Sequence, residues 1–548
     1  MTPPVDGGTA AGAKPPPAGA APVSTWQPLR LRVFRTLWIA QFVSNVGGWM
    51  QTVGAQWLIT QESGSAGLIA LVQTSASLPV LLLGIPAGAL ADIIDRRRLL
   101  LGAQVLMLAA AGLLAALTAL GRMNSYGVLA LTFVLGCGTA LMNPAWQAIQ
   151  PELVPREQIP SAAALGGVNM NLARAVGPAL GGLVVALAGT ATVFAVNAAS
   201  FLVTLAALAT WRRRAEPDPM GAERILPALR AGNRYVRNAP RVRRVLARSL
   251  LFVPCAAALW ALLPVAARQE LGMGAGGYGV LLGAVGVGAV FGAALLPRVR
   301  DRWSSNTTLA AGGILFAVTL ALLALLRIPW LVGLVLVFSG IAWVGVLSLL
   351  NAQMQVTTPG WVRARALAFY LTIFQGGMAV GAAVWGGVAD RIGLVPALLV
   401  AAVLLAAASL AGLALAVPDT QLDRSVSMHW AAPALVLDPP ETGGQVLVTI
   451  EYRVPPRNAD LFIESMRAMG RSRLRTGALH WDLYRDGTRP DTYLEVFQVA
   501  SWEEHLRQHS GRLTGFDRET EERARSLVDP DHPFQVTHYL PARASRPG

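Results

Sequence analysis

The sequence predicts an all-α membrane protein with twelve spanning helices in two six-helix halves, followed by a soluble α+β domain of ferredoxin-like order. Of its 548 residues, 54% are hydrophobic and 14% are charged, whereas soluble proteins carry about 25% charged residues. The apolar residues form long blocks, and about 20 such residues suffice for a helix to cross the hydrocarbon core. The twelve blocks have the approximate bounds 35–60, 66–91, 98–121, 126–149, 161–187, 190–211, 245–268, 275–297, 305–326, 329–356, 362–389 and 392–417.

The blocks and the breaks between them define six expected regions. They are a disordered Pro/Ala/Gly-rich arm (1–28), a first six-helix half (29–211), a basic central loop (212–244), a second six-helix half (245–418), a polar linker (419–444) and a soluble domain (445–548). From Arg212 to Arg248 there are eleven arginines against three acidic residues. Such a loop can hold a helix on an anionic inner leaflet, or it can be a plain linker.

The arginines also predict the orientation, because cytoplasmic loops of membrane proteins are enriched in basic residues. With the N-terminus inside, nine arginines of short loops lie in the cytoplasm: Arg96, Arg97, Arg98, Arg156, Arg298, Arg300, Arg302, Arg363 and Arg365. Four lie outside: Arg122, Arg268, Arg327 and Arg391. We therefore expect a multi-pass protein of a bacterial inner membrane with both termini in the cytoplasm.

Composition excludes several classes of function. The net charge of +14 resides in short loops between apolar blocks, which offer no surface for nucleic acid. Lys14 is the only lysine, so the chain lacks the P-loop lysine that contacts nucleotide phosphates. Cys137 and Cys255 lie within apolar blocks and predict no disulfide framework. We expect no cofactor.

The segment after residue 444 alternates between strand and helix patterns. The expected order is strand 445–454, helix 458–473, strands 479–485 and 493–499, a helix from 501 to 513, and strand 534–540. This β-α-β-β-α-β order is ferredoxin-like. Ser501 and Glu504 have the spacing of a capping box at the start of the second helix. His505 and His509 lie four residues apart on that helix, and without a third ligand we interpret them as a surface face, not a metal site.

The two halves of the membrane part repeat each other. Gly177–Gly182 in the fifth block matches Gly377–Ala382 in the eleventh, and Gln147-Ala148 in the fourth matches Asn351-Ala352 in the tenth. Parallel repeats of this kind occur in transporters built from two related halves.

These motifs resemble the major facilitator superfamily over residues 30–418. The run Gly88–Arg97 is similar to its loop signature between helices 2 and 3, although Ile93 replaces a basic residue and Asp95 a glycine. The runs Asn143–Gln147, Pro151–Pro155 and Asn171–Pro178 resemble the branch of bacterial enterobactin exporters and transmembrane secretion effectors.

The resemblance implies a secondary active, proton-coupled exporter of a small organic molecule, a siderophore or a drug, working by alternating access. Two alternatives stay open. One is an importer or lipid transporter of the same fold, and the other is a transporter whose soluble tail is an enzyme or a ligand sensor. The tail resembles dimeric α/β-barrel domains of the antibiotic-biosynthesis-monooxygenase type through its strand order and the run Trp502–His509. This implies a possible homodimer, and we do not expect an enzyme.

Polar side chains inside apolar helices mark the expected transport pathway, because a charge at the centre of a membrane is costly. Arg174 stands halfway along the fifth block. It either contacts an anionic or carboxylate group in the translocation cavity or caps backbone carbonyls of a neighbouring helix. Polar residues along the first block form one stripe, which lines a cavity or bonds between helices. The full set is Arg174, Asn171, Gln41, Asn45, Trp49, Gln56, Asn143, Gln147, Asn351, Gln355 and Gln375.

A second set of residues is expected to gate the pathway. A carboxylate at the end of the second block can pair with a facing helix in one state only, and glycines allow helices to approach closely or bend. The set is Gly88, Asp92, Arg96, Arg97, Gly177, Pro178, Gly181 and Gly182. The alternatives are a purely topological role for the arginines and ordinary small-residue packing for the glycines. No acidic residue lies mid-helix, which leaves Glu62 and Asp92 as candidates for proton coupling.

Overall fold

The computed structural model describes residues 26–211, 225–417, 423, 425, 427, 429, 430 and 444–541. Most of the expected disordered arm (1–28), part of the central loop and most of the linker lie outside these residues. The membrane part consists of α1 (Arg32–Glu62), α2 (Ala66–Ile93), α3 (Arg96–Ala119), α4 (Ser125–Leu153), α5 (Ile159–Thr210), α7 (Pro240–Gln269), α8 (Ala275–Arg302), α9 (Ser305–Leu325), α10 (Pro329–Thr357), α11 (Gly360–Ile392) and α12 (Leu394–Ala411).

Ten helices of the described residues are long and apolar enough to cross a membrane. One of the ten is α5, whose 52 residues include both the fifth and the sixth expected block. Gly189 interrupts it with a φ of 80°, a left-handed value that glycine adopts without steric cost. Helix α1 is long enough but more polar, and it is not among the ten.

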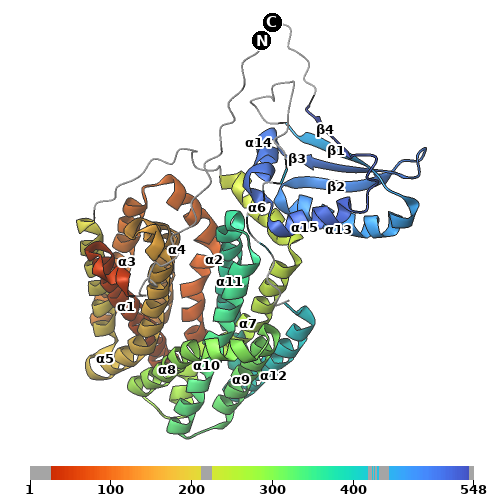
Figure 1. The fold of residues 1–548 in the computed structure, drawn as a ribbon. Helices are drawn as coiled ribbons and strands as arrows, with labels where there is room; N and C mark the ends of the chain where they lie inside the picture. The colour runs from red at the N-terminus through yellow and green to blue at the C-terminus, as the bar shows by residue number, and fades with distance from the viewer. Residues whose placement is uncertain are drawn as a thin grey trace.

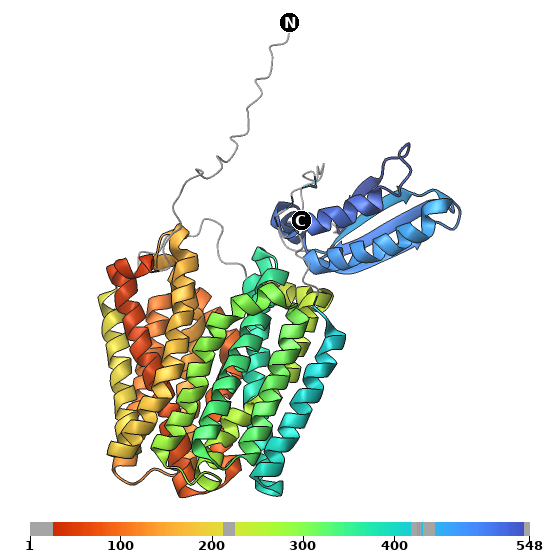
Figure 2. The same cartoon turned by 60° about the horizontal axis from the view of Figure 1, so that its bottom comes forward.

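The helices form two groups (Figures 1 and 2). In the first half, α1 and α3 pack against α5, and α2 and α3 pack against α4; in the second half, α8, α9 and α10 pack together, as do α7, α11 and α12. The halves meet where α5 lies against α8 and α2 lies against α11. A soluble domain lies at one end of the bundle, which we call the proximal end; the opposite end is the distal end (Figure 2).

Helix α6 (Ile225–Asn238), which lies within the expected central loop, connects the helical bundle with the soluble domain. It contacts α11 of the bundle and also α13 (Ala459–Thr476) of the soluble domain (Figure 1). Its Tyr235 ring packs edge-on against Trp361 at 5.7 Å. Arg234 bonds Glu504 of the soluble domain at 3.0 Å. Helix α6 and the proximal end of α11 therefore carry the soluble domain.

The soluble domain consists of β1 (Val446–Arg453), α13 (Ala459–Thr476), β2 (Ala478–Arg485), β3 (Thr492–Val499), α14 (Trp502–Arg507), a π-helical turn (Gln508–Arg512), α15 (Gly515–Arg525) and β4 (Gln535–Tyr539). Its antiparallel sheet has the order β2-β3-β1-β4. The inward side chains of β1, such as Val448 and Ile450, pack with Phe462 and Met466 of α13 to form the core. The sequence did not predict α15, which carries only a narrow apolar face.

Candidate functional site

The two halves are joined by polar contacts near the distal end. Gln56 of α1 is 1% exposed; its side-chain amide donates to the Trp260 carbonyl oxygen of α7 at 3.1 Å and accepts from the Tyr278 hydroxyl of α8. Trp57 stacks on Tyr278 at 6.4 Å. Gln56, which the sequence placed in the pathway, thus joins three helices across the seam.

Asp390 makes a second distal contact, between α11 and the first turn of α2. Its Oδ2 accepts hydrogen bonds from the Ser65 hydroxyl and the Gly67 amide, each at 3.0 Å. A carboxylate at a helix N-terminus is stabilised by the unsatisfied amides and by the helix dipole. Asp390 therefore favours the arrangement in which the distal ends of α2 and α11 touch.

Asp390→Asn should shift the protein toward states with an open distal end. Because the site is exposed, we expect the loss of charge to change the closed-to-open ratio by about fivefold, or roughly 1 kcal/mol. Labelling rates of a cysteine introduced at Ala70 would report the opening, since Gly386 packs on it. Asp301→Asn, at an exposed proximal position, is the control. Equal labelling in both variants would contradict this role.

Small residues permit the close contact of α5 with α8. A Cβ atom on Gly182 would lie 2.7 Å from the Ala275 carbonyl oxygen and from Gly279 Cα. Gly286 meets Ala175 Cα in the same way at 2.3 Å, one to two turns deeper. Gly177 and Gly181 face α1 instead, against Trp49 and Met50. Of the expected gating glycines, Gly182 thus lies on the seam. Gly177 and Gly181 instead allow α5 to pack closely against α1 within the first half.

A row of cationic and aromatic groups crosses the seam at mid-depth. The Arg174 guanidinium of α5 lies 5.4 Å from the Trp49 ring centroid of α1. Trp49 lies 6.0 Å from Trp260 of α7, which lies 5.4 Å from Trp343 of α10. Arg174 is the sixteenth residue of α5, about 22 Å along the helix at 1.5 Å per residue. The row therefore brings four helices of both halves to one place.

Three donors in this row are buried without a hydrogen-bond partner among the described residues: Arg174 Nε, Trp260 Nε1 and Trp343 Nε1. Buried polar groups are normally satisfied, and each exception needs a reason. A cluster of unsatisfied donors at the seam can accept a ligand that brings its own acceptor groups. We call Arg174, Trp49, Trp260 and Trp343 the central row.

The proximal part of the α1 stripe bonds between helices. Gln41 Nε2 donates to Asn45 Oδ1 at 3.0 Å, and Asn45 Nδ2 donates to Asn169 Oδ1 at 2.9 Å. Asn169 Nδ2 donates to the Trp38 carbonyl oxygen. Gln41 therefore bonds within α1, whereas Asn45 bonds across to Asn169 of α5 and helps to fix α1 to α5 beside the central row.

The other expected pathway residues lie in the proximal parts of α4, α10 and α11 or beside Arg174. Asn143, Gln147 and Gln355 are exposed, whereas Asn171, Asn351 and Gln375 are partly buried. Gln355 Nε2 donates to Asn351 Oδ1 at 2.6 Å. These amides retain free polar capacity, as does Gln41, whose buried Oε1 has no hydrogen-bond partner among the described residues.

The expected proximal gate has its contacts within the first half. Arg96 donates to Glu152 Oε1 at 2.7 Å and to the Ala148 carbonyl oxygen. Arg97 donates to the carbonyl oxygens of Leu208 and Ala209 at the end of α5. Around Gly88 there is open space. Asp92 belongs to α2, but its side chain lies outside the described residues.

Sequence reasoning missed Trp260, Trp343, Tyr278 and Asp390. The sequence did offer one signal for the tryptophans. This residue favours the two membrane interfaces, so a tryptophan in the middle of a membrane helix is unusual. Trp343 instead stands at the middle of α10, and Trp260 lies well inside α7. Asp390 was overlooked because its partners lie more than 320 residues away in the sequence.

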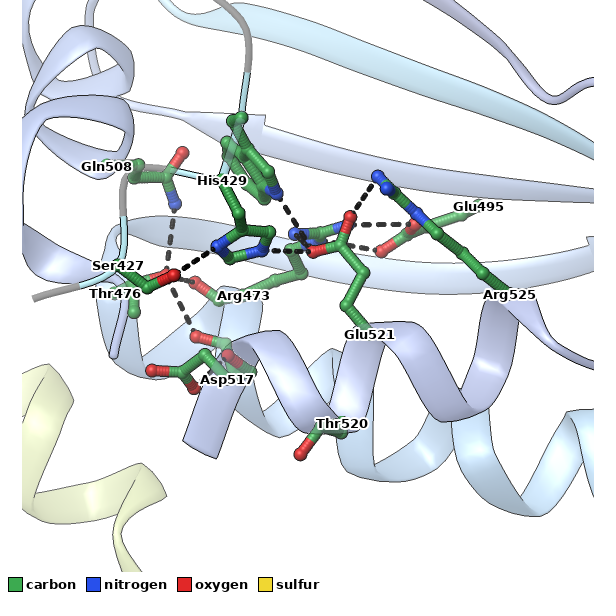
Figure 3. Close-up of polar contacts among 12 residues, drawn as sticks. Ser427, His429, Arg473, Thr476, Glu495, Gln508, Asp517, Thr520, Glu521 and Arg525 are labelled. Atoms are coloured by element: carbon green, nitrogen blue, oxygen red, sulfur yellow. Dashed lines mark hydrogen bonds and ion pairs between the residues drawn. The ribbon is translucent and has the colours of Figure 1, made fainter. Parts of the chain in front are cut away.

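The soluble domain has its own polar cluster (Figure 3). Arg473 and Glu495, 1% and 0% exposed, are bonded at 3.0 Å, and Arg473 also reaches Glu521 of α15 at 3.4 Å. Burial alone would lower the pKa of Arg473, but the two carboxylates raise it above its usual range. Burial would likewise raise the pKa of Glu521, yet Arg473 and hydrogen bonds from His429 and Trp430 hold it at about 2. The cluster is therefore charged at neutral pH.

His505 adjoins this cluster and does not lie on a surface face, so that expectation was wrong. It is 1% exposed, and its Nε2 lies 3.0 Å from His538 Nε2 and 3.2 Å from His509 Nε2. Among the described residues, no group of three or more potential ligands is arranged to hold a metal ion. The His505 ring is covered by the rings of Trp502, His509 and His538. Glu504 N–H bonds Ser501 Oγ as expected, but the Glu504 carboxylate bonds Arg512 and Arg234 instead of completing a capping box.

The soluble domain should lose stability in mild acid because of His505. Burial, with positive charge on His509 and His538, lowers the pKa of His505 to about 3. An unfolded histidine has a pKa near 6.5, so below that pH the unfolded state binds more protons and stability falls until about pH 3. Between pH 7 and pH 5 we expect a loss of about 2 kcal/mol.

Hydrogen exchange of the β3 amides in the full-length protein would measure this loss. His505→Gln should flatten the pH dependence, whereas His480→Gln, at an exposed position on β2, should leave it intact. A pH-independent exchange free energy in the wild type would contradict the assignment.

The helical bundle has the fold of major facilitator-type membrane transporters. The helical bundle is similar to a bacterial homologue of the human lysosomal transporter Spinster in an inward-facing, unoccupied conformation, with a TM-score of 0.58 and 14% identity over 71% of this chain and 97% of that one. It is also similar to an inward-facing bacterial homologue of the iron transporter ferroportin, with a TM-score of 0.53 and 15% identity over 70% and 99%.

The chain belongs to the transmembrane secretion effector family, whose pattern it matches over residues 23–547. It is 24% identical to the multidrug efflux pump Tap of Mycolicibacterium fortuitum over 67% of this chain and 90% of that protein. It is 24% identical to the staphyloferrin A transporter of Staphylococcus aureus over 47% and 66%. It is 28% identical to macrolide efflux protein A of Streptococcus pyogenes over 27% and 37%.

Proposed function

We propose that this protein is a secondary active exporter of small organic molecules, drugs or siderophores, in a bacterial inner membrane. The observation that carries the proposal is the central row: a guanidinium and three indoles from both halves, with three buried donors lacking partners. In transporters built from paired halves, substrate sites lie near the bilayer midplane at the seam. Relatives that are named as efflux pumps and as a siderophore transporter support the direction and the substrate class.

The proposed topology has twelve spans, with the proximal end and both termini in the cytoplasm. It counts the ten apolar helices, adds α1, and divides α5 at Gly189 into two spans. Arginines at the proximal ends of α3 and α8 support this orientation. In it, the contacts of Gln56, Asp390 and Gly182 close the outer side, and the pathway opens to the cytoplasm.

The proposed pathway runs from the exposed amides of α4 and α10 to the central row. Asn143, Gln147 and Gln355 would meet the substrate first, Asn351, Gln375 and Asn171 next, and Arg174 and Trp49 at mid-depth. Gln41 and Asn45 would support the wall. Arg96, Arg97 and Asp92 would close the inner side after the halves rock, with Gly88 giving room for the approach.

The chemistry of the central row indicates the kind of molecule that fits. An unsatisfied guanidinium favours carboxylate or other acceptor groups, and indole faces favour aromatic or apolar surface. A small amphipathic molecule with oxygen acceptors satisfies both. Proton coupling is part of the proposal. Its candidates are Asp92 and Glu62, which accepts a hydrogen bond from Ser125 Oγ at 2.6 Å, because no acidic residue among those that the structure describes lies at mid-depth.

Retention of candidate substrates by whole cells tests this function. Cells lacking the gene should retain more of a macrolide or of staphyloferrin A than cells carrying it, and re-expression should restore the lower level. Lower content in the deletion strain would instead identify an importer.

For the soluble part, we propose a ferredoxin-like domain, supported by the strand order β2-β3-β1-β4 and the helices between the strands. The exposed edge strand β4, with Val536 and Tyr539 about half exposed, leaves a surface on which a second copy can pair. Sedimentation of the purified protein would distinguish dimer from monomer. The expected boundaries 29–211, 245–418 and 445–548 remain our proposed division of the chain.

A further inference from the structure

Residues of the expected linker lie on the soluble domain as an extended strap. Backbone hydrogen bonds attach it to the start of α15: the amide of Ser427 donates to the Leu513 carbonyl oxygen at 2.9 Å, and the amide of Gly515 donates to the Ser425 carbonyl oxygen at 3.0 Å. The Phe516 amide donates to the Asp423 carbonyl oxygen in the same way. A side chain at Gly515 would collide with Asp423. The domain is therefore shaped to receive this strap.

His429 and Trp430 of the strap contact the polar cluster. Trp430 Nε1 donates to Glu521 Oε2 at 2.8 Å, and the Arg473 guanidinium lies 4.5 Å from the indole centroid. The His509 and Trp430 rings are in T-shaped contact, with their centroids 4.7 Å apart. His429 Nε2 lies 3.3 Å from the same Glu521 oxygen (Figure 3). The indole thus has a partner for its N–H, its face and its edge, yet it remains partly exposed.

This arrangement is that of a ligand in a recognition site, except that the ligand is tethered. The site's charged members are held by contacts independent of the strap, because Arg473 bonds Glu495 and Glu495 also accepts from Tyr452 and Trp481. A flat ring with one hydrogen-bond donor would reproduce every contact of Trp430. A tethered group acts at a high local concentration, so a free ligand binds only when it outcompetes the strap.

Residues 504–512, which adjoin this site, contact α6 and α11 of the membrane part. His509 touches Trp430, whereas Glu504 and Arg512, one turn away on either side, bond each other at 2.5 Å. Glu504 binds Arg234 of α6, and the Arg512 guanidinium lies 4.8 Å from the Trp361 ring of α11. Part of this segment is π-helical, an irregular form frequent at functional sites. One short segment therefore contacts Trp430 as well as α6 and α11.

We propose that the soluble domain holds a recognition site for a flat aromatic molecule bearing an N–H or O–H donor, that Trp430 occupies this site in the absence of ligand, and that residues 504–512 couple its occupancy to α6 and α11. The proposal goes beyond the transport function and does not depend on it.

Binding of 5-fluoroindole to the full-length protein in detergent, followed by fluorine NMR, tests the site. Trp430→Ala should bind the probe about tenfold or more tightly than the wild type, because the tethered competitor is gone. Adding Glu521→Gln to Trp430→Ala should weaken binding again. Trp303→Ala, at an exposed tryptophan at the end of α8, gives the background partition into micelles. Equal affinity of the wild type and Trp430→Ala, or binding by Trp430→Ala no stronger than this background, would overturn the site.

Hydrogen exchange on the same proteins tests the coupling. Trp430→Ala should speed exchange in residues 504–512 and in α6, and the probe should restore protection in both segments. Restoration confined to 504–512 would overturn the coupling. Neither experiment involves transport, so a failure here would leave the proposed export function standing, and a failure of export would leave these results interpretable.

Discussion

Arg174→Ala is expected to abolish export while the protein stays in the membrane at wild-type abundance. Arg174 is the charged member of the central row, and its Nε has no partner among the described residues. A hydrogen bond to a charged group contributes roughly 1.5–3 kcal/mol, so loss of a substrate contact should reduce the transport rate on the order of 10- to 100-fold. Because none of the described residues forms an ion pair with this group, the folded bundle should tolerate its removal.

Two further variants separate substrate binding from charge alone. Arg174→Lys keeps a cation but loses the planar donor fork, so we expect intermediate transport. Arg122→Ala removes an exposed arginine from the distal loop before α4 and should leave transport unchanged. Efflux of a labelled macrolide from preloaded cells measures all three. Full transport by Arg174→Ala would remove this residue from the mechanism.

Gly182→Val is expected to stop transport by a different route, because it prevents closure of the distal end. The new side chain would meet the backbone of α8 at Ala275 and Gly279. Backbone atoms cannot rotate away, so α5 and α8 must separate, and the distal-closed state is lost. An exporter that cannot close its outer side cannot present the site to the cytoplasm, and efflux should fall to background.

Gly167→Val is the matched control, since it makes the same change in the same helix where a Cβ atom meets open space. It carries the same helix-propensity effect without the collision. Distances between spin labels on the distal ends of α2 and α11 should lengthen in Gly182→Val and stay unchanged in Gly167→Val. A distal-closed distance in Gly182→Val would show that α5 and α8 adapt, contrary to this account.

The membrane helices could be predicted closely because hydrophobic length is a property of the sequence alone. The strands of the soluble domain were predictable from their two-residue alternation. Helix α15 was missed since its exposed face dominates its composition, and its buried residues Asp517 and Glu521 are polar. The gap between the expected blocks 161–187 and 190–211 coincides with Gly189, where the backbone of α5 is non-helical.

The candidate site could be predicted only in part, because polar residues stand out in apolar helices whereas aromatic ones do not. Arg174 was selected in this way, and Trp49 because it shares the polar stripe of the first block, but Trp260 and Trp343 look like ordinary core residues until the fold aligns them with Arg174. Gln41 and Gln56 share one stripe in the sequence, yet the structure gives them different neighbours, Asn45 for the first and Tyr278 for the second. Whether the distal or the proximal end of the bundle is closed depends on contacts between helices that are far apart in the sequence. No local sequence pattern predicts these contacts.

Substrate uptake by everted membrane vesicles tests the central claim, export through the central row, most directly. Vesicles containing the wild-type protein and acidified inside should accumulate a labelled macrolide or staphyloferrin A, a protonophore should release it, and vesicles containing Arg174→Ala should accumulate no more than empty ones. Accumulation equal to that of empty vesicles for both substrates with the wild type, or accumulation undiminished by Arg174→Ala, would contradict the account.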